Sequence, residues 1–231
     1  MAVASVVRII TSLLPRIARS LCIIVKSSCS DFAITLMTIT TNGWSMTELD
    51  RCRVSITGTP GCGKSSLAQY AISQRSKYEL LEVIQLAEEY GCIGEIDEID
   101  DARPIDIEKL AEKLGDKWNE KPSGTTFVDG HLSHLLPVDA IVILRCNPEI
   151  LTARNRERGW VESKILENSE WELLGGSWNE SHEWGDLPCL ELNSTEQSVG
   201  ALFEEMGCWI RDGFKPKGPE EQIDWVSVLH E

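Results

Sequence analysis

The stretch that decides the fold is residues 56–70, ITGTPGCGKSSLAQY. It places three glycines and one proline between an apolar run and a run with helical character, and a single lysine, Lys64, stands where the two runs meet. Glycine weakens regular elements, so this stretch gives up local stability for a backbone shape that other residues avoid. Such a backbone indicates a ligand-binding turn.

The glycine spacing matches a phosphate-binding pattern. Gly58, Gly63, Lys64 and Ser65 fit G-x-x-x-x-G-K-[ST], between a strand-like run and a helix-like run. In this loop successive N–H groups turn inward around an anion, and the positive end of the following helix adds to the attraction. We predict that Lys64 contacts the β- and γ-phosphates, that Ser65 coordinates Mg²⁺, and that Ser66 reaches the α-phosphate. The alternative is a glycine-rich turn without a ligand.

Beyond this loop, short apolar runs alternate with longer helical stretches. Strands are expected at residues 52–57, 78–84, 125–129, 139–145 and 189–193. Helices are expected at 64–75, 106–118, 148–158, 161–178 with a break at Gly175 and Gly176, and 197–211. Strand–helix alternation of this kind predicts parallel strands in a three-layer α/β domain, whose ligands bind beyond the carboxyl ends of the strands.

The ends of the chain differ from the middle. We expect a variable N-terminal extension over residues 1–45, a nucleotide-binding domain over 46–213 and a Pro/Gly-rich C-terminal tail over 214–231. The extension carries four basic side chains and one acidic one, and it lacks the run of about 18 uncharged apolar residues that crosses a bilayer. It is either an organelle-targeting peptide or, as we prefer, a dispensable segment that is disordered or not native, with Met37 or Met46 as the start.

Composition excludes several classes of protein. With 42% hydrophobic residues the chain can build a core. Its 37 acidic and 22 basic residues give a net charge of −15, which disfavours general nucleic-acid binding and requires that a nucleotide be held by a local site. The eight cysteines form no C-x-x-C pair and no metal-binding spacing, so we predict free thiols, no structural zinc and a cytoplasmic location.

An acidic residue ends the third expected strand. A phosphate-binding loop needs a second anchor for its metal, and Asp129 stands where a neighbouring strand ends. His131 follows two residues later and is expected to line the same cleft, although a lone histidine more often has a packing role. Ser133 and His134 are interpreted as structural, and the acidic run 95–101 as a solvated, mobile loop.

Arginines are the remaining requirement, because charge on a transferring phosphoryl group is best neutralised by planar cations. The sequence LTARNRERGW (151–160) offers Arg154, Arg156 and Arg158, and helical spacing places the first and last on one face. Gly159 and Trp160 follow, and they favour a closing lid over a solvated helix face.

Together these segments resemble the archaeal-type adenylate kinase family, which includes eukaryotic adenylate kinase isoenzyme 6. The similarity lies in ITGTPGCGKSS (56–66), VDGHLSHLLPVDAIVILRCNPEIL (128–151), RERGW (156–160) followed by ILEN (165–168), and IDW (223–225). It spans about residues 52–228, and VDGHLSH is far more specific than the glycine loop. The resemblance implies a P-loop nucleoside-monophosphate kinase domain with a five-stranded parallel sheet, an AMP-side segment at about 83–106 and a lid at about 157–167.

The resemblance also implies roles for individual residues. Gly61, Gly63, Lys64, Ser65, Ser66 and Arg158 would contact ATP, and Asp129 with His131 would form the family's modified Walker B element. Members of the family also hydrolyse ATP and act in maturation of the small ribosomal subunit, where they bind a ribosomal protein of its platform. For this chain the resemblance implies ATP, AMP and such a ribosomal protein as partners, with pre-rRNA as a further candidate contact. The chain departs from the family at 172–185, where ELLGGSWNESHEWG replaces a continuous helix, and in the extension before Met46.

Our hypothesis is transfer of the γ-phosphoryl group of MgATP to AMP, with slow ATP hydrolysis when AMP is absent. The catalytic residues would be Lys64, Asp129, His131 and Arg158. The main alternative is an ATP-gated assembly factor that binds a ribosomal protein, with kinase activity incidental. A GTPase is disfavoured because no N-K-x-D element is present, and another small-molecule P-loop kinase is disfavoured by the VDGHLSH segment.

Overall fold

The structure is a computed structural model that describes residues 20–23, 37–40, 51–96 and 103–229. The chain divides into two compact units, Met1–Met46 and Thr47–Glu231. In the first unit, β1 (Ser20–Ile23) and β2 (Met37–Thr40) pair antiparallel. The rest of the expected extension lies outside the described residues, as does most of the acidic run 95–101.

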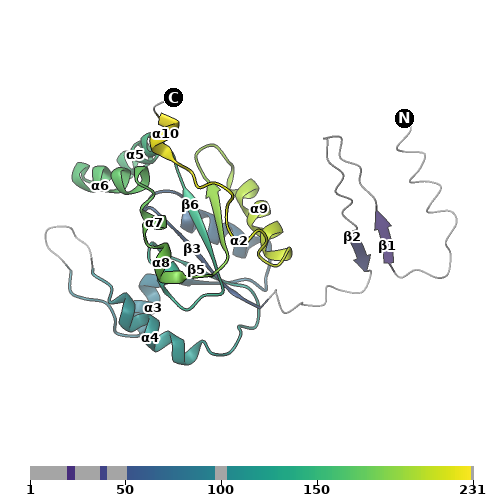
Figure 1. The fold of residues 1–231 in the computed structure, drawn as a ribbon. Helices are drawn as coiled ribbons and strands as arrows, with labels where there is room; N and C mark the ends of the chain where they lie inside the picture. Colours follow the sequence, from purple (N-terminus) through teal and green to yellow (C-terminus); the bar gives the residue numbers. More distant parts are fainter. Residues whose placement is uncertain (1–19, 24–36, 41–50, 97–102, 230–231) are drawn as a thin grey trace, which may run out of the picture. The chain divides into compact units, whose positions relative to one another are not determined.

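The second unit is built on a five-stranded sheet (Figure 1). Its strands are β3 (Arg53–Gly58), β4 (Glu79–Glu82), β5 (Thr126–Asp129), β6 (Ala140–Arg145) and β7 (Cys189–Asn193). They lie in the order β4-β5-β3-β6-β7, and every neighbouring pair is parallel. The expected α/β fold with a parallel five-stranded sheet is therefore confirmed.

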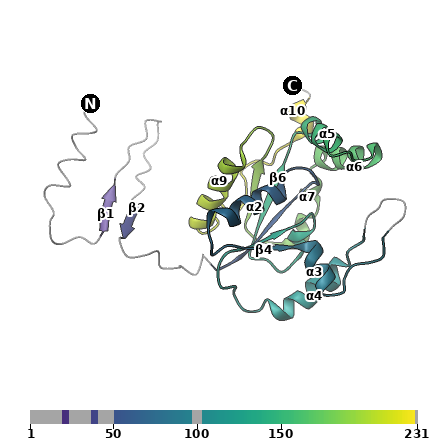
Figure 2. The ribbon, with the colours of Figure 1, turned by 180° about the vertical axis from the view of Figure 1, so that it is seen from behind.

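Helices cover both faces of this sheet, as Figures 1 and 2 show from opposite sides. On one face lie α2 (Lys64–Gln74) and α9 (Val199–Arg211), which pack on Val142 and Leu144 of β6. On the other face lie α3 (Val83–Glu89), α4 (Ile107–Lys117) and α8 (Ser181–Trp184), which pack on Ile141 and Ile143. Because alternate residues of β6 face different layers and both layers are apolar, its first five residues, AIVIL, form an unbroken apolar run.

Beyond the end of β6, two helices form a paired projection. These helices, α5 (Pro148–Glu157) and α6 (Glu162–Leu173), contact each other along their length. The turn between them and the first half of α6 make up the expected lid segment 157–167. Gly175 has φ 64, in the left-handed region, so the chain breaks there before α7 (Gly176–Asn179), as the glycine pair predicted.

One expected strand is too long. Residues 78–84 were expected to form a strand, but β4 ends at Glu82 and α3 begins at Val83. The prediction was wrong for Val83 and Ile84 because β-branched residues alone suggested a strand. Val83, Leu86 and Ala87 instead have the i, i+3, i+4 spacing of a helix face, and all three are buried.

The C-terminal residues pack against the sheet domain instead of forming a separate tail. The ring of Phe214 lies 5.0 Å from that of Trp209, whose indole N–H donates to the Pro216 carbonyl. The Lys217 carbonyl accepts from the amide of Cys189 in β7, and Trp225, the first residue of α10 (Trp225–Leu229), is 3% exposed. Residues 214–229 are thus part of the same compact unit.

The described residues contain neither a membrane-spanning helix nor a disulfide bond. Within these ranges, no helix combines the length and the apolar character needed to cross a bilayer. The six cysteines whose side chains the structure describes form no disulfide bond with one another, and five of them are buried.

Candidate active site

The glycine loop joins the end of β3 to the start of α2 at the carboxyl edge of the sheet. Gly58 has φ 127, and a Cβ there would lie 2.2 Å from the Leu144 carbonyl oxygen of the neighbouring strand. Gly61 has φ 101, and a Cβ there would lie 2.2 Å from Oδ1 of Asn155. Both positions therefore exclude any side chain, and the loop lies tightly between β6 and α5.

The helix α2 begins with three polar residues, Lys64, Ser65 and Ser66, which provide one ammonium group and two hydroxyl groups. Lys64 is only 8% exposed, and its Nζ donates to the Thr59 carbonyl at 3.0 Å, which folds the side chain back over the loop. Ser65 and Ser66 are exposed in the first turn of α2. An ammonium group and two hydroxyls thus belong to the first turn of a helix, an arrangement that attracts phosphate.

Asp129 ends β5, the strand beside β3, and pairs in register with Ile56. The carboxyl is 7% exposed, and its Oδ1 is buried without a hydrogen-bond partner. Burial raises the pKa of Asp129, against the opposing effects of the Ser65 hydroxyl and the Lys64 charge. A buried carboxylate oxygen beside a serine hydroxyl fits Mg²⁺, which prefers hard oxygen ligands and keeps several waters.

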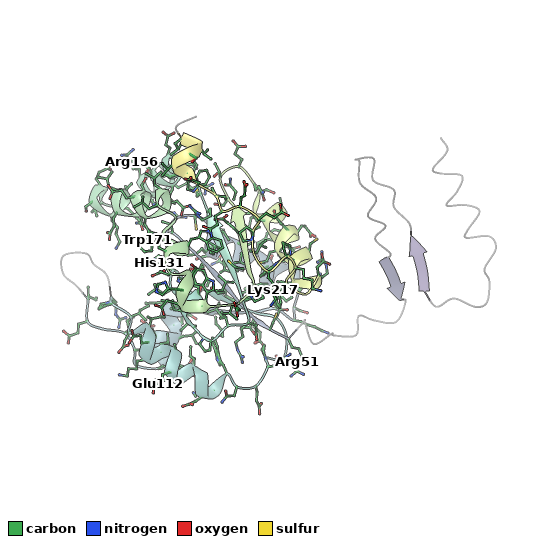
Figure 3. All side chains as sticks on the ribbon, in the orientation of Figure 1. Arg51, Glu112, His131, Arg156, Trp171 and Lys217 are labelled. Atoms are coloured by element: carbon green, nitrogen blue, oxygen red, sulfur yellow. The ribbon has the colours of Figure 1, made fainter. Side chains whose placement is uncertain are left out.

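His131 lies just beyond this carboxylate, with its ring edge-on to that of Trp171 at a centroid distance of 6.2 Å (Figure 3). Its Nδ1 is 3.3 Å from the Gly58 carbonyl, which only accepts, so Nδ1 carries the proton. Burial lowers the pKa of His131, the Gly58 carbonyl raises it, and the Lys64 charge lowers it. The ring is therefore neutral near pH 7, and its Nε2 has a free lone pair.

A group of hydrogen-bonded polar residues, Thr57 and His134 among them, lies next to His131. Thr57 donates its hydroxyl proton to the His131 carbonyl at 2.7 Å, and the same oxygen lies 2.8 Å from Nδ1 of His134. His134 is 2% exposed, its Nε2 lies 2.9 Å from Glu180, and burial lowers its pKa to about 4. The side chain of Ser133 lies 2.7 Å from that of Ser55. The side chains of Ser133 and His134 thus contact neighbouring residues of the fold, in line with a structural role.

The arginines after β6 separate into two groups. Arg154 and Arg158 line a cavity of about 200 Å³ together with Gly61, Gly63 and Ser66. Arg154 is held there by the Ser194 carbonyl at 2.9 Å, whereas Arg158 is exposed. Arg156 is paired with Glu162 at the outer end of the helix pair, away from His131 (Figure 3).

A second cavity, of about 520 Å³, lies on the other side of the loop. Lys64, Ser65, Asp129 and His131 line it from the sheet edge. Val83, Ile84 and Arg103 are among the residues that line it from the segment expected at the AMP side, of which 97–102 lie outside the described residues. Lys64 and Ser65 thus line the larger cavity, whereas their chain neighbours Gly63 and Ser66 line the smaller one.

Sequence reasoning missed two polar residues that hold the loop. Asn155 is fully buried, its Nδ2 donates to the Pro60 carbonyl at 3.3 Å, and its Oδ1 has no partner. Glu172 is 1% exposed and accepts from the Thr59 hydroxyl. They belong to α5 and α6, for which the sequence predicted only the arginines and the lid. A polar residue on the apolar side of its helix was the available signal.

A parallel sheet in this order, with a phosphate-binding loop after its central strand and an acidic residue ending the adjacent strand, defines a P-loop phosphotransferase of the nucleoside-monophosphate kinase type. The sequence profile of the family described as AAA domain matches residues 54–175. The chain is 39% identical over 184 residues to "Putative adenylate kinase" of Archaeoglobus fulgidus, covering 77% of this chain and 94% of the relative.

Another protein of that name, from Methanocaldococcus jannaschii, is 36% identical over 175 residues, covering 76% of this chain and 93% of the relative. Among solved structures, a gluconokinase from Sinorhizobium meliloti matches with a TM-score of 0.46 and 13% identity, covering 72% of this chain and 95% of that one. The chain belongs to the adenylate kinase family of the archaeal proteins.

Proposed function

We propose that this enzyme transfers the γ-phosphoryl group of MgATP reversibly to AMP. The observation that carries the proposal is that four consecutive residues of the loop and helix line two cavities. Gly63 and Ser66 line the smaller one, and Lys64 and Ser65 line the larger one together with Asp129. A phosphoryl transfer needs a donor site and an acceptor site that meet at one set of cationic groups. The relatives' printed name supports AMP as the acceptor.

The donor nucleotide is assigned to the smaller cavity. Its lining offers loop backbone from Gly61 and Gly63, the Ser66 hydroxyl and the guanidinium of Arg158. The acceptor is assigned to the larger cavity. There Arg103 provides a cation at the rim, now paired with Glu88 at 2.7 Å, and Asp129 faces it from the sheet edge.

The chain's own residues then perform positioning and charge neutralisation. Lys64 leaves the Thr59 carbonyl to contact the β- and γ-phosphates, and the loop amides fix the tail in line with the acceptor. Arg158 neutralises charge that develops on the transferring group as the turn at Gly159 closes and excludes water. Ser65 and Asp129 would hold Mg²⁺, which would supply positive charge to offset that of the phosphates.

In the absence of AMP, His131 is assigned to orient a water toward the γ-phosphate. Its neutral ring offers Nε2 as an acceptor because Nδ1 donates to the Gly58 carbonyl. Changing His131→Gln is therefore expected to lower ATP hydrolysis without acceptor by roughly 100-fold, the lower end of the range for one general base. The dissociation constant of MgATP, measured by calorimetry, is expected to change less than about threefold.

The exposed His182 provides the control for this experiment, since His182→Gln should leave both quantities unchanged. Equal losses of binding and hydrolysis in the His131 variant would contradict the assignment, because they would make His131 a part of the nucleotide site alone.

The proposed reaction is tested with the full chain in assays of ADP formation with AMP, CMP, dAMP and no acceptor. AMP is expected to give the highest kcat/KM, and reaction without acceptor is expected to be slow. ATP binding without phosphorylation of any monophosphate would sink the kinase proposal. Nucleotide-dependent binding of a basic ribosomal protein of the small subunit, in that event, would favour the alternative of an assembly factor.

An assembly role has one line of support in this chain. The net charge of −15 is complementary to a basic protein partner and repels bare RNA, so a ribosomal protein is favoured over direct contact with pre-rRNA. The two activities are compatible, since nucleotide binding can gate release of a partner.

A further inference from the structure

Glu172 is the centre of a buried polar network behind the glycine loop. It belongs to α6, is 1% exposed, and uses both carboxylate oxygens. Oε1 accepts from Arg145 Nε at 2.7 Å, from Trp225 Nε1 at 2.9 Å and from the amide of Cys146 at 3.1 Å. Oε2 accepts from the Thr59 hydroxyl. One side chain thus joins α6, the end of β6, the C-terminal segment and the loop.

The network reaches the reactive lysine through Thr59. This threonine is 1% exposed, so water has little access to its hydroxyl. Its hydroxyl donates to Glu172, and its carbonyl accepts from Lys64 Nζ at 3.0 Å. Any rotation of the Thr59 peptide therefore moves both the lysine and the first turn of the loop. Asn155 supports the next residue, through the Pro60 carbonyl.

The charges in the network favour a positioning role over a stabilising one. Arg145 lies between two buried carboxylates, Glu172 and Glu191, so three ionised side chains carry one uncompensated negative charge. Buried ion pairs of this kind contribute little net stability, because desolvation offsets their attraction. Neutral donors offset the excess: the amide of Ile223 donates to Glu191 at 2.8 Å, and the indole of Trp225 donates to Glu172.

We infer that Glu172 is a positioning residue for the glycine loop, because it holds Thr59 and, through Thr59, Lys64. The C-terminal residues Ile223–Trp225 in turn hold Glu172 and its partner Arg145, through the Trp225 indole and the Ile223 carbonyl. Nothing in the motif spacing assigns this role. The inference rests on the proposed function only in requiring that the loop bind the phosphates of ATP.

The test compares two replacements of Thr59. Thr59→Ser keeps the hydroxyl, whereas Thr59→Val keeps the shape and leaves a buried carboxylate oxygen without its donor. The dissociation constant of MgATP is expected to rise about tenfold in the valine variant, the loss typical of one hydrogen bond to a charged group. In the serine variant we expect a change of less than about twofold.

A core variant separates positioning from general destabilisation. Ile141→Val, in the opposite layer of the core, should lower the melting temperature without changing the affinity for MgATP. If the valine and serine variants of Thr59 bind MgATP equally well, Glu172 only stabilises the fold and the inference is overturned. Binding is measured without turnover, so failure of wild-type protein to phosphorylate AMP would count against the proposed function and not against this network.

The C-terminal clamp is tested by Trp225→Phe, which removes the indole N–H and keeps an aromatic ring. We expect it to weaken MgATP binding several-fold. In the double variant with Thr59→Val, the loss should be smaller than the product of the two single losses, because both act through Glu172. Independent, fully multiplicative losses would show that Trp225 does not act through this carboxylate.

Discussion

Replacing Lys64 with alanine is expected to remove AMP phosphorylation and ATP hydrolysis together, with a fall in kcat of at least about 100-fold in each. Both reactions break the same bond, and in the proposed function Lys64 is the cation that the loop itself supplies to the phosphates. It is 8% exposed in a site with little water, where a charge acts more strongly than in solution. The measurement is ADP formation with and without AMP, beside calorimetric titration of MgATP.

Two controls sharpen the result. Lys109→Ala removes an exposed lysine of α4 and should leave both rates unchanged. Lys64→Arg keeps the charge but replaces a compact ammonium with a wider planar group in a closely packed loop, so we expect it to recover only a small part of the activity. Substantial turnover by the alanine variant would refute the assignment of this loop as the phosphate site.

The sheet could be predicted from the sequence because its physics is local. A strand buried on both faces is largely apolar, so runs such as AIVIL in β6 stand out from their helical neighbours. The expected positions of Lys64 and Asp129 follow in turn, since the carboxyl ends of parallel strands share one edge of the sheet.

The supporting residues could not be predicted in the same way. Glu172 and Asn155 are ordinary helix residues until α5 and α6 are packed beside the loop, which brings Glu172 to Thr59 over 113 residues of chain. The same holds for Trp225, which appeared to belong to a tail because the Pro/Gly-rich residues before it form no regular element. Its burial depends on an acceptor, Glu172, that lies 53 residues away.

Replacing Asp129 with asparagine is expected to lower kcat by about 100-fold while leaving the fold at least as stable as the wild type. Asparagine keeps the shape and can still accept from Ser65, but it lacks the charge that we propose binds Mg²⁺. In the wild type that charge is costly, since burial raises the pKa of Asp129 and Oδ1 has no donor. Function and stability therefore conflict at this position.

The sign of the pH dependence follows from the raised pKa. A carboxyl that holds its proton more tightly when folded favours folding below its ordinary pKa of about 4, and this contribution is lost as pH rises through the raised value. The free energy of unfolding, measured without nucleotide, should therefore differ between wild type and Asp129→Asn chiefly above that window, with the variant favoured.

Asp186→Asn, at an exposed site, supplies the comparison for loss of a surface carboxylate. A melting temperature for Asp129→Asn well below that of wild type would mean that the ionised carboxylate stabilises the folded chain. A buried carboxylate without a donor should instead make the wild type less stable than the variant. A lower melting temperature of the variant would therefore contradict the proposal that Asp129 is kept ionised at a cost in stability in order to bind a metal. If the activity of the variant depends on the Mg²⁺ concentration in the same way as that of the wild type, the assignment of Asp129 as a Mg²⁺ ligand is also contradicted.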